Sequence, residues 1–394
     1  MSESSLATFI NLCKNKLLDS RSLSKELPMK KLAIIGGGII GMTLANYIDL
    51  KKYTVTIYDT PIGQATKASA GIISPWLSKR RNKKWYQLAK DGAAFYPKLV
   101  KDFSLTESVY QQTGTLILRK DGELEPLRSL AEERKLAAPE IGDVHLLTPQ
   151  QVSEKLPLLA PSPALFVTGG GKLDGASYLE TLRQRALTQH ITLKNGSVTL
   201  NRTLDKWIVH TPIETEHFDE IALCAGPGLP SLLEPLGYKT DIRAQKGQLL
   251  AFETPFKESS HWPVAMLDGE SDLIPFENGK ILVGATHEND AGFDLSPTKE
   301  AFSILKQKTA PFLAMSSFFE DYPAAYRVGT RAYTSDFAPF FNCLPDDPTA
   351  VVASGLGSSG LTTGPYIGFL LADYFNSGKS KWQEYQKTID HYLK

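Results

Sequence analysis

Cysteine is scarce in this sequence: the chain of 394 residues contains three, Cys13, Cys224 and Cys343. An odd number of widely separated cysteines without a CxxC pair excludes a disulfide scaffold and a zinc knuckle. The seven histidines show no HxxxH or HExxH spacing, and no stretch has the spacing of a calcium loop. We therefore expect a protein of a reducing compartment, the cytoplasm, that holds no metal.

The sequence also lacks an excess of either charge, with 43 basic and 43 acidic residues. A neutral chain has no global field that would recruit nucleic acid or an anionic membrane. No window reaches the ~18 apolar residues of a membrane span. Residues 1–28 lack the basic start, apolar run and cleavage site of a signal peptide. These absences predict a soluble, cytoplasmic protein.

What is present is the composition of a globular protein, with 42% hydrophobic and 22% charged residues. A chain of this length predicts two or three domains. In the N-terminal extension, residues 1–28, apolar side chains recur at helical spacing and predict a short amphipathic helix: Leu6, Phe9, Ile10, Cys13 and Leu17.

A glycine-rich loop stands between an expected strand and an expected helix. Residues 31–35 (KLAII) are an apolar run typical of a buried parallel strand, and residues 36–41 follow with the GxGxxG pattern. Residues 42–50 then predict a helix, and residues 54–58 (TVTIY) the next strand. This order predicts a βαβ unit that binds a nucleotide.

The glycines of this loop have separate physical roles. Gly36 permits the tight turn, Gly38 lets backbone N–H groups approach a pyrophosphate, and Gly41 lets the helix pack closely on the strand. The helix N-terminus favours a diphosphate there. Asp59 follows the second strand, where a carboxylate accepts hydrogen bonds from a ribose and disfavours a 2′-phosphate. The loop alone leaves NAD and FAD as alternatives.

A second junction of the same kind occurs near the C-terminus. Residues 350–353 (AVVA) predict a strand, residues 355–360 (GLGSSG) a loop, and residues 361–375 a helix with Pro365 in its first turns. Two such junctions at opposite ends of the chain predict one cofactor domain that is assembled from distant segments, with another domain inserted between them.

Further segments complete a resemblance to the FAD-dependent amine and amino-acid oxidoreductases, the family of D-amino-acid oxidase, glycine oxidase and D-amino-acid dehydrogenase. The resemblance covers nearly all of residues 30–376. Its matching segments are the small-residue stretch 65–73, the adenine-contacting stretch 195–198, the alanine-glycine turn 223–226, residues 246–248, the strand 279–286 (GKILVGAT), the RxxTxDxxP pattern at 331–339 and the flavin-facing loop 355–361.

The resemblance implies an α/β fold in which a Rossmann-like FAD-binding domain of discontinuous segments is interleaved with an α+β substrate domain built on an antiparallel sheet. It implies an FAD-binding domain made of residues 29–110, 165–242 and 325–394. The substrate domain would comprise residues 111–164 and 243–324.

The resemblance also implies FAD as cofactor. Sarcosine oxidases carry a flavin-linked cysteine where this sequence has Arg331, so the FAD is expected to be noncovalent. The residues expected to contact it are Gly36, Gly38, Ile39, Ile40, Gly41, Asp59, Ser69, Ala70, Gly71, Ile72, Val198, Gly226, Gly355, Gly357, Ser358, Gly360, Leu361 and Thr362. The hydroxyl of Thr363 is a further expected donor.

The implied reaction is oxidation of the C–N bond of a small amino acid or secondary amine, by hydride transfer to flavin and hydrolysis of the imine, with oxygen or a quinone as electron acceptor. Arg331 is the expected catalytic-site residue, because a guanidinium binds a carboxylate bidentately. A structural salt bridge of Arg331 with Asp336 or Asp321 is the alternative. Asp272 stands where the family places a tyrosine; either the correspondence is shifted along the sequence, or the substrate offers a cationic group there.

His287, directly after GKILVGAT, is a second candidate polar contact for the substrate, and an exposed strand-end histidine is the alternative interpretation. Two further classes compete with the amine oxidoreductase: a nicotinamide dehydrogenase on the same fold, and a flavin-binding protein without turnover.

An RNA substrate is another alternative, because residues 355–365 (GLGSSGLTTGP) also resemble the FAD domain of the enzyme that oxidises a carboxymethylaminomethyl group on the wobble uridine of tRNA. RNA recognition needs basic residues interleaved with aromatic ones. The basic cluster of residues 79–84 has this composition, flanked by Trp76, Trp85 and Tyr86. The alternative interpretation of the cluster is a solvated helix start.

Overall fold

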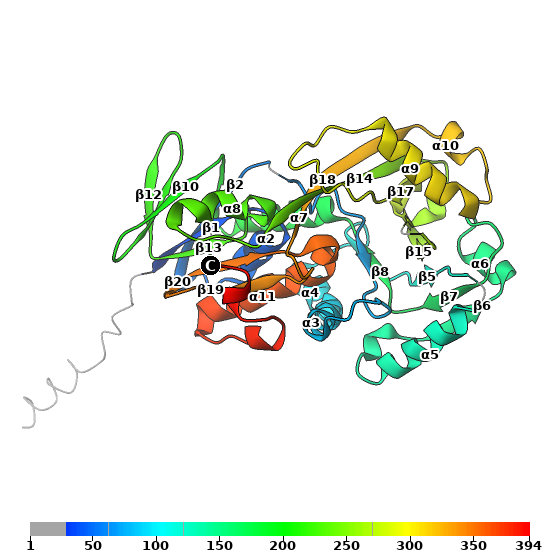
Figure 1. Cartoon of the computed structure of the whole chain (residues 1–394), viewed down its shortest axis with the longest axis horizontal. Coiled ribbons are helices and arrows are strands. Elements are labelled where there is room, and N and C mark those ends of the chain that lie inside the picture. The colour runs from blue at the N-terminus through cyan, green and yellow to red at the C-terminus, as the bar shows by residue number, and fades with distance from the viewer. Residues whose placement is uncertain (1–28, 62, 121, 270) are drawn as a thin grey trace, which may run out of the picture.

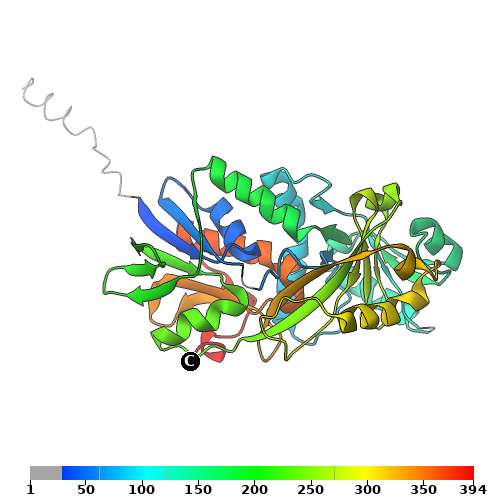
Figure 2. The same cartoon turned by 90° about the horizontal axis from the view of Figure 1, so that it is seen from above.

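The computed structural model of the chain describes residues 29–61, 63–120, 122–269 and 271–394. The N-terminal helix expected within residues 1–28 lies outside this range. Two large sheets dominate the molecule and lie toward opposite ends of its long axis, as Figures 1 and 2 show. Two small three-stranded sheets accompany them.

The first large sheet has six strands in the order β19-β20-β13-β1-β2-β9. All neighbours are parallel except β19, which is antiparallel to β20. Its strands come from both ends of the chain, as the two glycine junctions predict. Their bounds are β1 (Lys30–Ile35), β2 (Tyr53–Asp59), β9 (Thr192–Asn195), β13 (Glu220–Leu223), β19 (Phe340–Leu344) and β20 (Asp347–Ser354).

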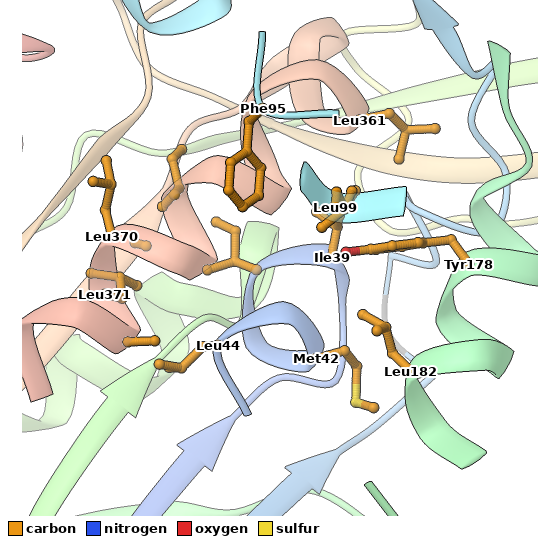
Figure 3. Packing of buried hydrophobic residues seen from close by; sticks show 14 of the residues in the cluster. Ile39, Met42, Leu44, Phe95, Leu99, Tyr178, Leu182, Leu361, Leu370 and Leu371 are labelled. Atoms are coloured by element: carbon orange, nitrogen blue, oxygen red, sulfur yellow. The ribbon is translucent and has the colours of Figure 1, made fainter. Parts of the chain in front are cut away.

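Helices cover this parallel sheet, and α2 (Ile39–Tyr47) is enclosed by α7 (Gly175–Thr188) and α11 (Gly360–Ser377). Every residue of α2 from Ile39 to Asn46 is buried, which accounts for its apolar sequence. Figure 3 shows Ile39, Leu44 and Leu371 in this apolar core. The sequence predicts this helix at residues 42–50. In the structure it spans Ile39–Tyr47, so it begins and ends three residues earlier. Two further helices, α3 (Lys83–Ala94) and α4 (Tyr96–Phe103), contact this helical layer.

The second large sheet has eight strands in the order β18-β14-β17-β16-β15-β5-β7-β6. It is antiparallel except between β15 and β5. The strand bounds are β5 (Thr115–Ile117), β6 (Val144–Leu147), β7 (Ala164–Val167), β14 (Arg243–Glu253), β15 (Val264–Met266), β16 (Asp272–Pro275), β17 (Lys280–Gly284) and β18 (Ala324–Tyr333).

Helices accompany the eight-stranded sheet at the end remote from the parallel sheet (Figure 1). Leu305 and Phe318, on two of these helices, share an apolar core with Leu250 and Phe252 of β14. The helices are α5 (Leu124–Lys135), α6 (Pro149–Lys155), α9 (Lys299–Thr309) and α10 (Phe318–Asp321).

Smaller elements join the two large sheets. One small sheet has the order β3-β8-β4 and runs between them, and the other, β10-β11-β12, lies beside the parallel sheet. Their bounds, with the remaining short helix, are β3 (Ile72–Ile73), β4 (Tyr110–Gln111), β8 (Gly171–Leu173), β10 (Thr199–Arg202), β11 (Trp207–His210), β12 (Thr215–Phe218) and α8 (Leu229–Leu233).

A mostly parallel sheet with helices beside an antiparallel sheet is the expected fold class, which is thereby confirmed. The residue boundaries of the two domains stay a proposal. By its pairing with β14, strand β18 belongs to the eight-stranded sheet, although the sequence assigned residues from 325 onward to the FAD-binding segments. Among the described residues, no helix combines the length and apolarity needed to cross a membrane.

Candidate active site

A cavity of about 960 Å³ runs from the glycine loop after β1 to the face of the eight-stranded sheet. Its lining includes Ile35 and Asp59, at the carboxyl ends of β1 and β2, as well as Leu249 and Asp272 on β14 and β16. In open α/β sheets, ligands bind outside the carboxyl ends of the parallel strands. The cavity therefore joins the expected nucleotide site to the expected substrate site.

Two glycines of the first loop, Gly36 and Gly41, are packed too closely for any other residue. Gly36 has φ +112°, and a Cβ there would lie 2.3 Å from the carbonyl oxygen of Cys224. A Cβ on Gly41 would lie 2.0 Å from the carbonyl oxygen of Gly36. Gly38, in contrast, faces the cavity, and the nearest atom to its added Cβ would be Thr66 Oγ1 at 3.7 Å. The loop thus keeps backbone open to a ligand at the start of α2.

Asp59 is held in the orientation that a ribose requires. Its Oδ1 accepts a hydrogen bond from the Gly37 N–H at 2.8 Å, and its other oxygen accepts none from the described residues. The Asp59 carbonyl accepts from the N–H of Gly196 at 2.8 Å, which brings the stretch with Val198 to the cavity wall. One carboxylate oxygen is therefore anchored, and the second is available to a ligand hydroxyl.

The central and C-terminal parts of the predicted FAD contacts also reach the cavity. Gly71 has φ +92°, and a Cβ there would lie 2.3 Å from the carbonyl oxygen of Leu173. A glycine at this position therefore permits the close approach of its backbone to that of Leu173. The N-terminus of α11 opens onto the same space, which gives a partial positive charge to the cavity. The predicted residues that line it here are Ser69, Ala70, Gly71, Ile72, Gly226, Gly357, Ser358, Gly360 and Leu361.

Three predicted cofactor contacts do not line the cavity: Gly41, Gly355 and Thr362. Gly41 allows α2 to pack, as described above, and Gly355 has φ +79° in the turn before α11. The Thr362 hydroxyl donates to the carbonyl of Ile72 at 3.4 Å, and the Thr363 hydroxyl to that of Ser359 at 3.0 Å. Both hydroxyls therefore donate hydrogen bonds to backbone carbonyls of the chain itself.

Arg331 projects from β18 across Gly247 of β14, where an added Cβ would lie 2.5 Å from its Nη1. Nη1 donates to Gln245 Oε1 at 3.1 Å and to the Thr286 carbonyl at 3.0 Å. Nε and Nη2 donate to no acceptor within the described residues. Burial lowers the pKa of Arg331, and the neighbouring Tyr333 and Glu288 oppose that shift. An arginine stays protonated in a protein. The cavity is therefore lined by a positively charged guanidinium whose Nε and Nη2 donate to no described residue.

The alternative interpretation of Arg331 as a structural ion pair does not hold for the described residues. Asp336 pairs instead with Lys387 at 2.7 Å. Asp321 accepts a hydrogen bond from Ser317 Oγ at 2.6 Å. Both expected partners of Arg331 therefore have other donors.

Asp272 and His287, the other two predicted substrate contacts, line the same cavity. Burial raises the pKa of Asp272 to about 7, and nearby Arg119 opposes the rise. An Asp with this pKa takes up and releases a proton near neutral pH. Such perturbed groups in a cavity are typical of functional sites.

The sequence interpretation missed two arginines that line the cavity, Arg119 and Arg80. Arg80 donates to Ser358 Oγ at 3.1 Å and stacks 4.5 Å from the ring centre of Trp85. It had been counted in the basic cluster. A strand prediction with the correct face for residues 115–117 would have indicated Arg119, because alternate residues share a face.

The basic cluster of residues 79–84 is not an aromatic-lined surface. Trp76 and Trp85 are only 1% and 4% exposed, so they offer no face for base stacking. Lys84 Nζ donates to the carbonyls of Gln383 and Gln386, at 2.9 and 2.6 Å. Asn82 caps α3 by accepting from the N–H of Trp85 at 3.0 Å. Two of the three flanking rings therefore pack inward at a helix start, whereas Tyr86 is half-buried, and RNA binding by this cluster stays a proposal.

No group of histidine, cysteine and acidic side chains in the described part of the chain is arranged to hold a metal ion. The donor set fits a dinucleotide instead: backbone N–H groups at the start of α2, one available oxygen of Asp59, and small residues along the cavity. Isoalloxazine chemistry would be supported by the positive end of α11.

Comparison with known proteins supports this assignment. A family model described as "FAD dependent oxidoreductase" matches residues 31–374. The "Uncharacterized oxidoreductase YurR" of Bacillus subtilis (strain 168) is 34% identical over 359 residues, which span 87% of this chain and 94% of that protein. Glycine oxidase of Pseudomonas putida is 26% identical over 349 residues, or 85% of this chain and 92% of the relative.

A solved structure agrees with these sequence matches. The crystal structure of iminodiacetate oxidase from Chelativorans sp. BNC1 has a TM-score of 0.84 and 27% sequence identity. The match covers 92% of this chain and 98% of that chain. The similarity therefore extends over the part of the chain that forms both large sheets.

Proposed function

The chain belongs to the family of FAD-dependent oxidoreductases, and on that premise we propose that it oxidises the C–N bond of a small amino acid or secondary amine that carries a carboxylate. The observation that supports this proposal most directly is the Arg331 guanidinium, which is anchored through Nη1 and lines the same cavity as the glycine loops. The names of two relatives, a glycine oxidase and an iminodiacetate oxidase, describe the same kind of chemistry.

When bound, FAD supplies two-electron oxidation: it accepts a hydride from the carbon beside nitrogen, the nitrogen loses a proton, and water hydrolyses the imine to a carbonyl compound and an amine. The residues that would hold FAD are those of the glycine loop, Asp59, the 69–72 stretch and the start of α11. Oxygen or a quinone would be the external acceptor of the electron pair.

Arg331 contributes orientation and charge. Two parallel N–H···O bonds from Nε and Nη2 fix a carboxylate and therefore the position of the adjacent carbon. Gln245 and the Thr286 carbonyl hold the guanidinium in place, so little side-chain entropy is lost when the substrate binds. Asp272, on the same cavity wall, supplies a group that accepts a proton near neutral pH.

The test is anaerobic mixing of the purified holoenzyme with glycine, N-methylglycine and a panel of D-amino acids. We expect at least one of these amines to bleach the visible absorption of the oxidised flavin. A holoenzyme that stays fully oxidised with every compound would contradict the proposal and would favour a flavin-binding protein without turnover. Reoxidation of the bleached enzyme by air or by a soluble quinone then identifies the acceptor.

Oxidation of a carboxymethylaminomethyl group on tRNA would use the same bond chemistry, and we rank it second. The reason is the burial of Trp76 and Trp85, which removes two of the three aromatic rings that flank residues 79–84. Absence of salt-dependent tRNA binding in a filter assay is the expected result.

A further inference from the structure

The chain segment that follows β17 departs from the regular ladder beside Arg331. Strands β14 and β17 are neighbours in the eight-stranded sheet (Figure 1). Leu249 of β14 lies opposite Gly284, the last residue of β17, and Lys246 lies opposite Glu288. A step of three residues on β14 is thus matched by a step of four on the other segment, which is a β-bulge. Bulges next to a site re-aim the groups that follow them.

Beyond the bulge, Thr286 and Gln248 form an altered antiparallel pair. The N–H of Thr286 donates to the carbonyl of Gln248 at 3.0 Å, as in a regular ladder. The return bond from the N–H of Gln248 goes to the hydroxyl of Thr286 at 2.9 Å, where a regular pair would use the carbonyl. The Thr286 carbonyl is thereby released, and it accepts from Arg331 Nη1 at 3.0 Å.

Glu288 fixes the direction of the Thr286 hydroxyl. That hydroxyl donates its own hydrogen to Glu288 Oε1 at 2.5 Å, and the same oxygen accepts from Gln248 Nε2 at 2.9 Å. The backbone of Glu288 is bonded to that of Lys246 in both directions, at 2.9 and 3.0 Å. Thr286 and Gln248 are buried, so water does not compete for these bonds.

The second anchor of Arg331 depends on the same segment. Gln245, whose Oε1 accepts from Arg331 Nη1, donates through Nε2 to Asn289 Oδ1 at 2.8 Å. The charge of Glu288, together with Tyr333, opposes the lowering of the Arg331 pKa by burial. Within the described chain, Glu288 forms no salt bridge with Arg331. Its carboxylate therefore acts at one remove and leaves Nε and Nη2 of the guanidinium to a ligand.

We propose that Glu288 is a positioning residue for substrate binding: it holds the Thr286 hydroxyl on the Gln248 N–H, so that the Thr286 carbonyl stays on Arg331. This inference rests on the proposed function, in which Arg331 binds the substrate carboxylate. Without the Glu288 carboxylate, the hydroxyl hydrogen loses its acceptor, and the Gln248 N–H returns to the carbonyl of the regular ladder. Arg331 then loses one of its two anchors and the orientation in which it binds a carboxylate.

The test measures the binding of a carboxylate that has no C–N bond to oxidise. Methoxyacetate has oxygen where N-methylglycine has nitrogen, and methoxyacetamide is its neutral counterpart. Titration calorimetry of the oxidised holoenzyme gives the Kd of each compound. In the wild type the acid should bind more tightly than the amide, because a guanidinium forms charge-assisted hydrogen bonds with a carboxylate.

Glu288→Ala should raise the Kd of methoxyacetate at least ~5-fold, which corresponds to about one hydrogen bond, and should leave that of methoxyacetamide within ~2-fold. Glu288→Gln keeps an oxygen that accepts from Thr286, so both values should stay within ~2-fold of the wild type. The matched control is Glu253→Ala at the end of β14, an exposed residue that does not line the cavity, and wild-type values are expected there.

Thr286 provides a second pair of variants. Thr286→Val removes the hydroxyl from a side chain of similar shape and should weaken methoxyacetate binding as Glu288→Ala does, whereas Thr286→Ser should keep the wild-type Kd. The double variant with Glu288→Ala should bind no more weakly than the weaker single variant, because both changes break the same contact. If Glu288→Ala binds no FAD, Glu288→Gln and the two Thr286 variants decide.

The outcomes separate the two proposals. An unchanged Kd for methoxyacetate in Glu288→Ala, an equal rise for acid and amide, a Glu288→Gln variant that behaves like Glu288→Ala, or additive effects in the double variant each overturn the role of Glu288, while amine oxidation stands. Failure of the wild type to bind methoxyacetate overturns the carboxylate site at Arg331 and this inference with it. Failure of every amine in the panel to bleach the flavin, with the expected binding results, overturns the proposed function and leaves Glu288 as a positioning residue of a carboxylate site.

Discussion

Removal of the Arg331 side chain provides the most direct test of the catalytic site. In the Arg331→Ala variant, a substrate carboxylate loses two charge-assisted hydrogen bonds, from Nε and Nη2, in a site that is largely shielded from water. Truncating one partner of a buried charge pair costs ~2–5 kcal/mol. Since ~1.4 kcal/mol is tenfold in binding, KM for the carboxylate substrate should rise at least ~30-fold.

The assay is steady-state kinetics of the purified holoenzyme. The dissociation constant of the substrate is measured separately, from the rate of flavin reduction after anaerobic rapid mixing at several substrate concentrations. Loss of the Nη1 bonds to Gln245 and Thr286 adds a stability cost of ~1 kcal/mol per bond, which thermal denaturation reports separately. Arg327→Ala is the matched control, since Arg327 lies on the same strand but pairs with Asp174 at 3.2 Å and does not line the cavity.

The control variant should lose stability and keep its KM. An unchanged KM in Arg331→Ala would refute the reasoning. So would an equal rise in the Arg327→Ala control, because the effect would then be structural.

Three further predictions concern the cofactor and the acid on the sheet. Gly41→Val would place its side chain on the Gly36 carbonyl, so the ratio of flavin to protein absorbance should fall below a tenth of wild type; a normal ratio would contradict the packing argument. Acid precipitation should release all the yellow colour into the supernatant, since Arg331 offers no thiol for a covalent link, and flavin in the pellet would oppose this. Burial raises the pKa of Asp272 to about 7 in the folded chain. Between pH ~4 and ~7 the folded chain therefore keeps the carboxyl proton that the unfolded chain releases. The contribution of Asp272 to the free energy of unfolding is lost as the pH rises through this range. Asp272→Asn should therefore be more stable than wild type at pH 8, relative to pH 5, by at most ~3 kcal/mol in chemical denaturation, and an identical pH dependence would show that the carboxyl titrates normally.

The nucleotide half of the site could be predicted from sequence because its signals are local. Strand, glycines, helix and Asp59 follow one another within a short stretch, and the structure shows a steric reason for Gly36 and for Gly41. The resemblance also indicated Arg331 and Asp272 as substrate contacts, and both residues line one cavity. Residues whose role depends on packing were less predictable: Thr362 lies next to the correct loop, but its hydroxyl turns to the Ile72 carbonyl.

The substrate half depends on strand register, which a single sequence does not specify. The position of Arg119 on the cavity wall depends on the parallel pairing of β5 with β15, two segments that lie far apart in the chain. A count of charges in the basic cluster likewise says nothing of the direction in which each side chain points. Arg80 points into the cavity and Lys84 into the C-terminal segment, so the cluster is divided among separate local contacts.

The strand order of the parallel sheet constrains how this protein matures on the ribosome. Strand β1 pairs with β13, which in turn pairs with β20, and α11 closes over α2. The nascent chain therefore exposes the apolar surface of α2 until almost the last helix has left the exit tunnel. Capture of the cofactor is postponed to the same moment, because the loop before α11 forms one wall of the cavity. The first glycine loop alone therefore does not complete the cofactor site, which also needs the loop before α11.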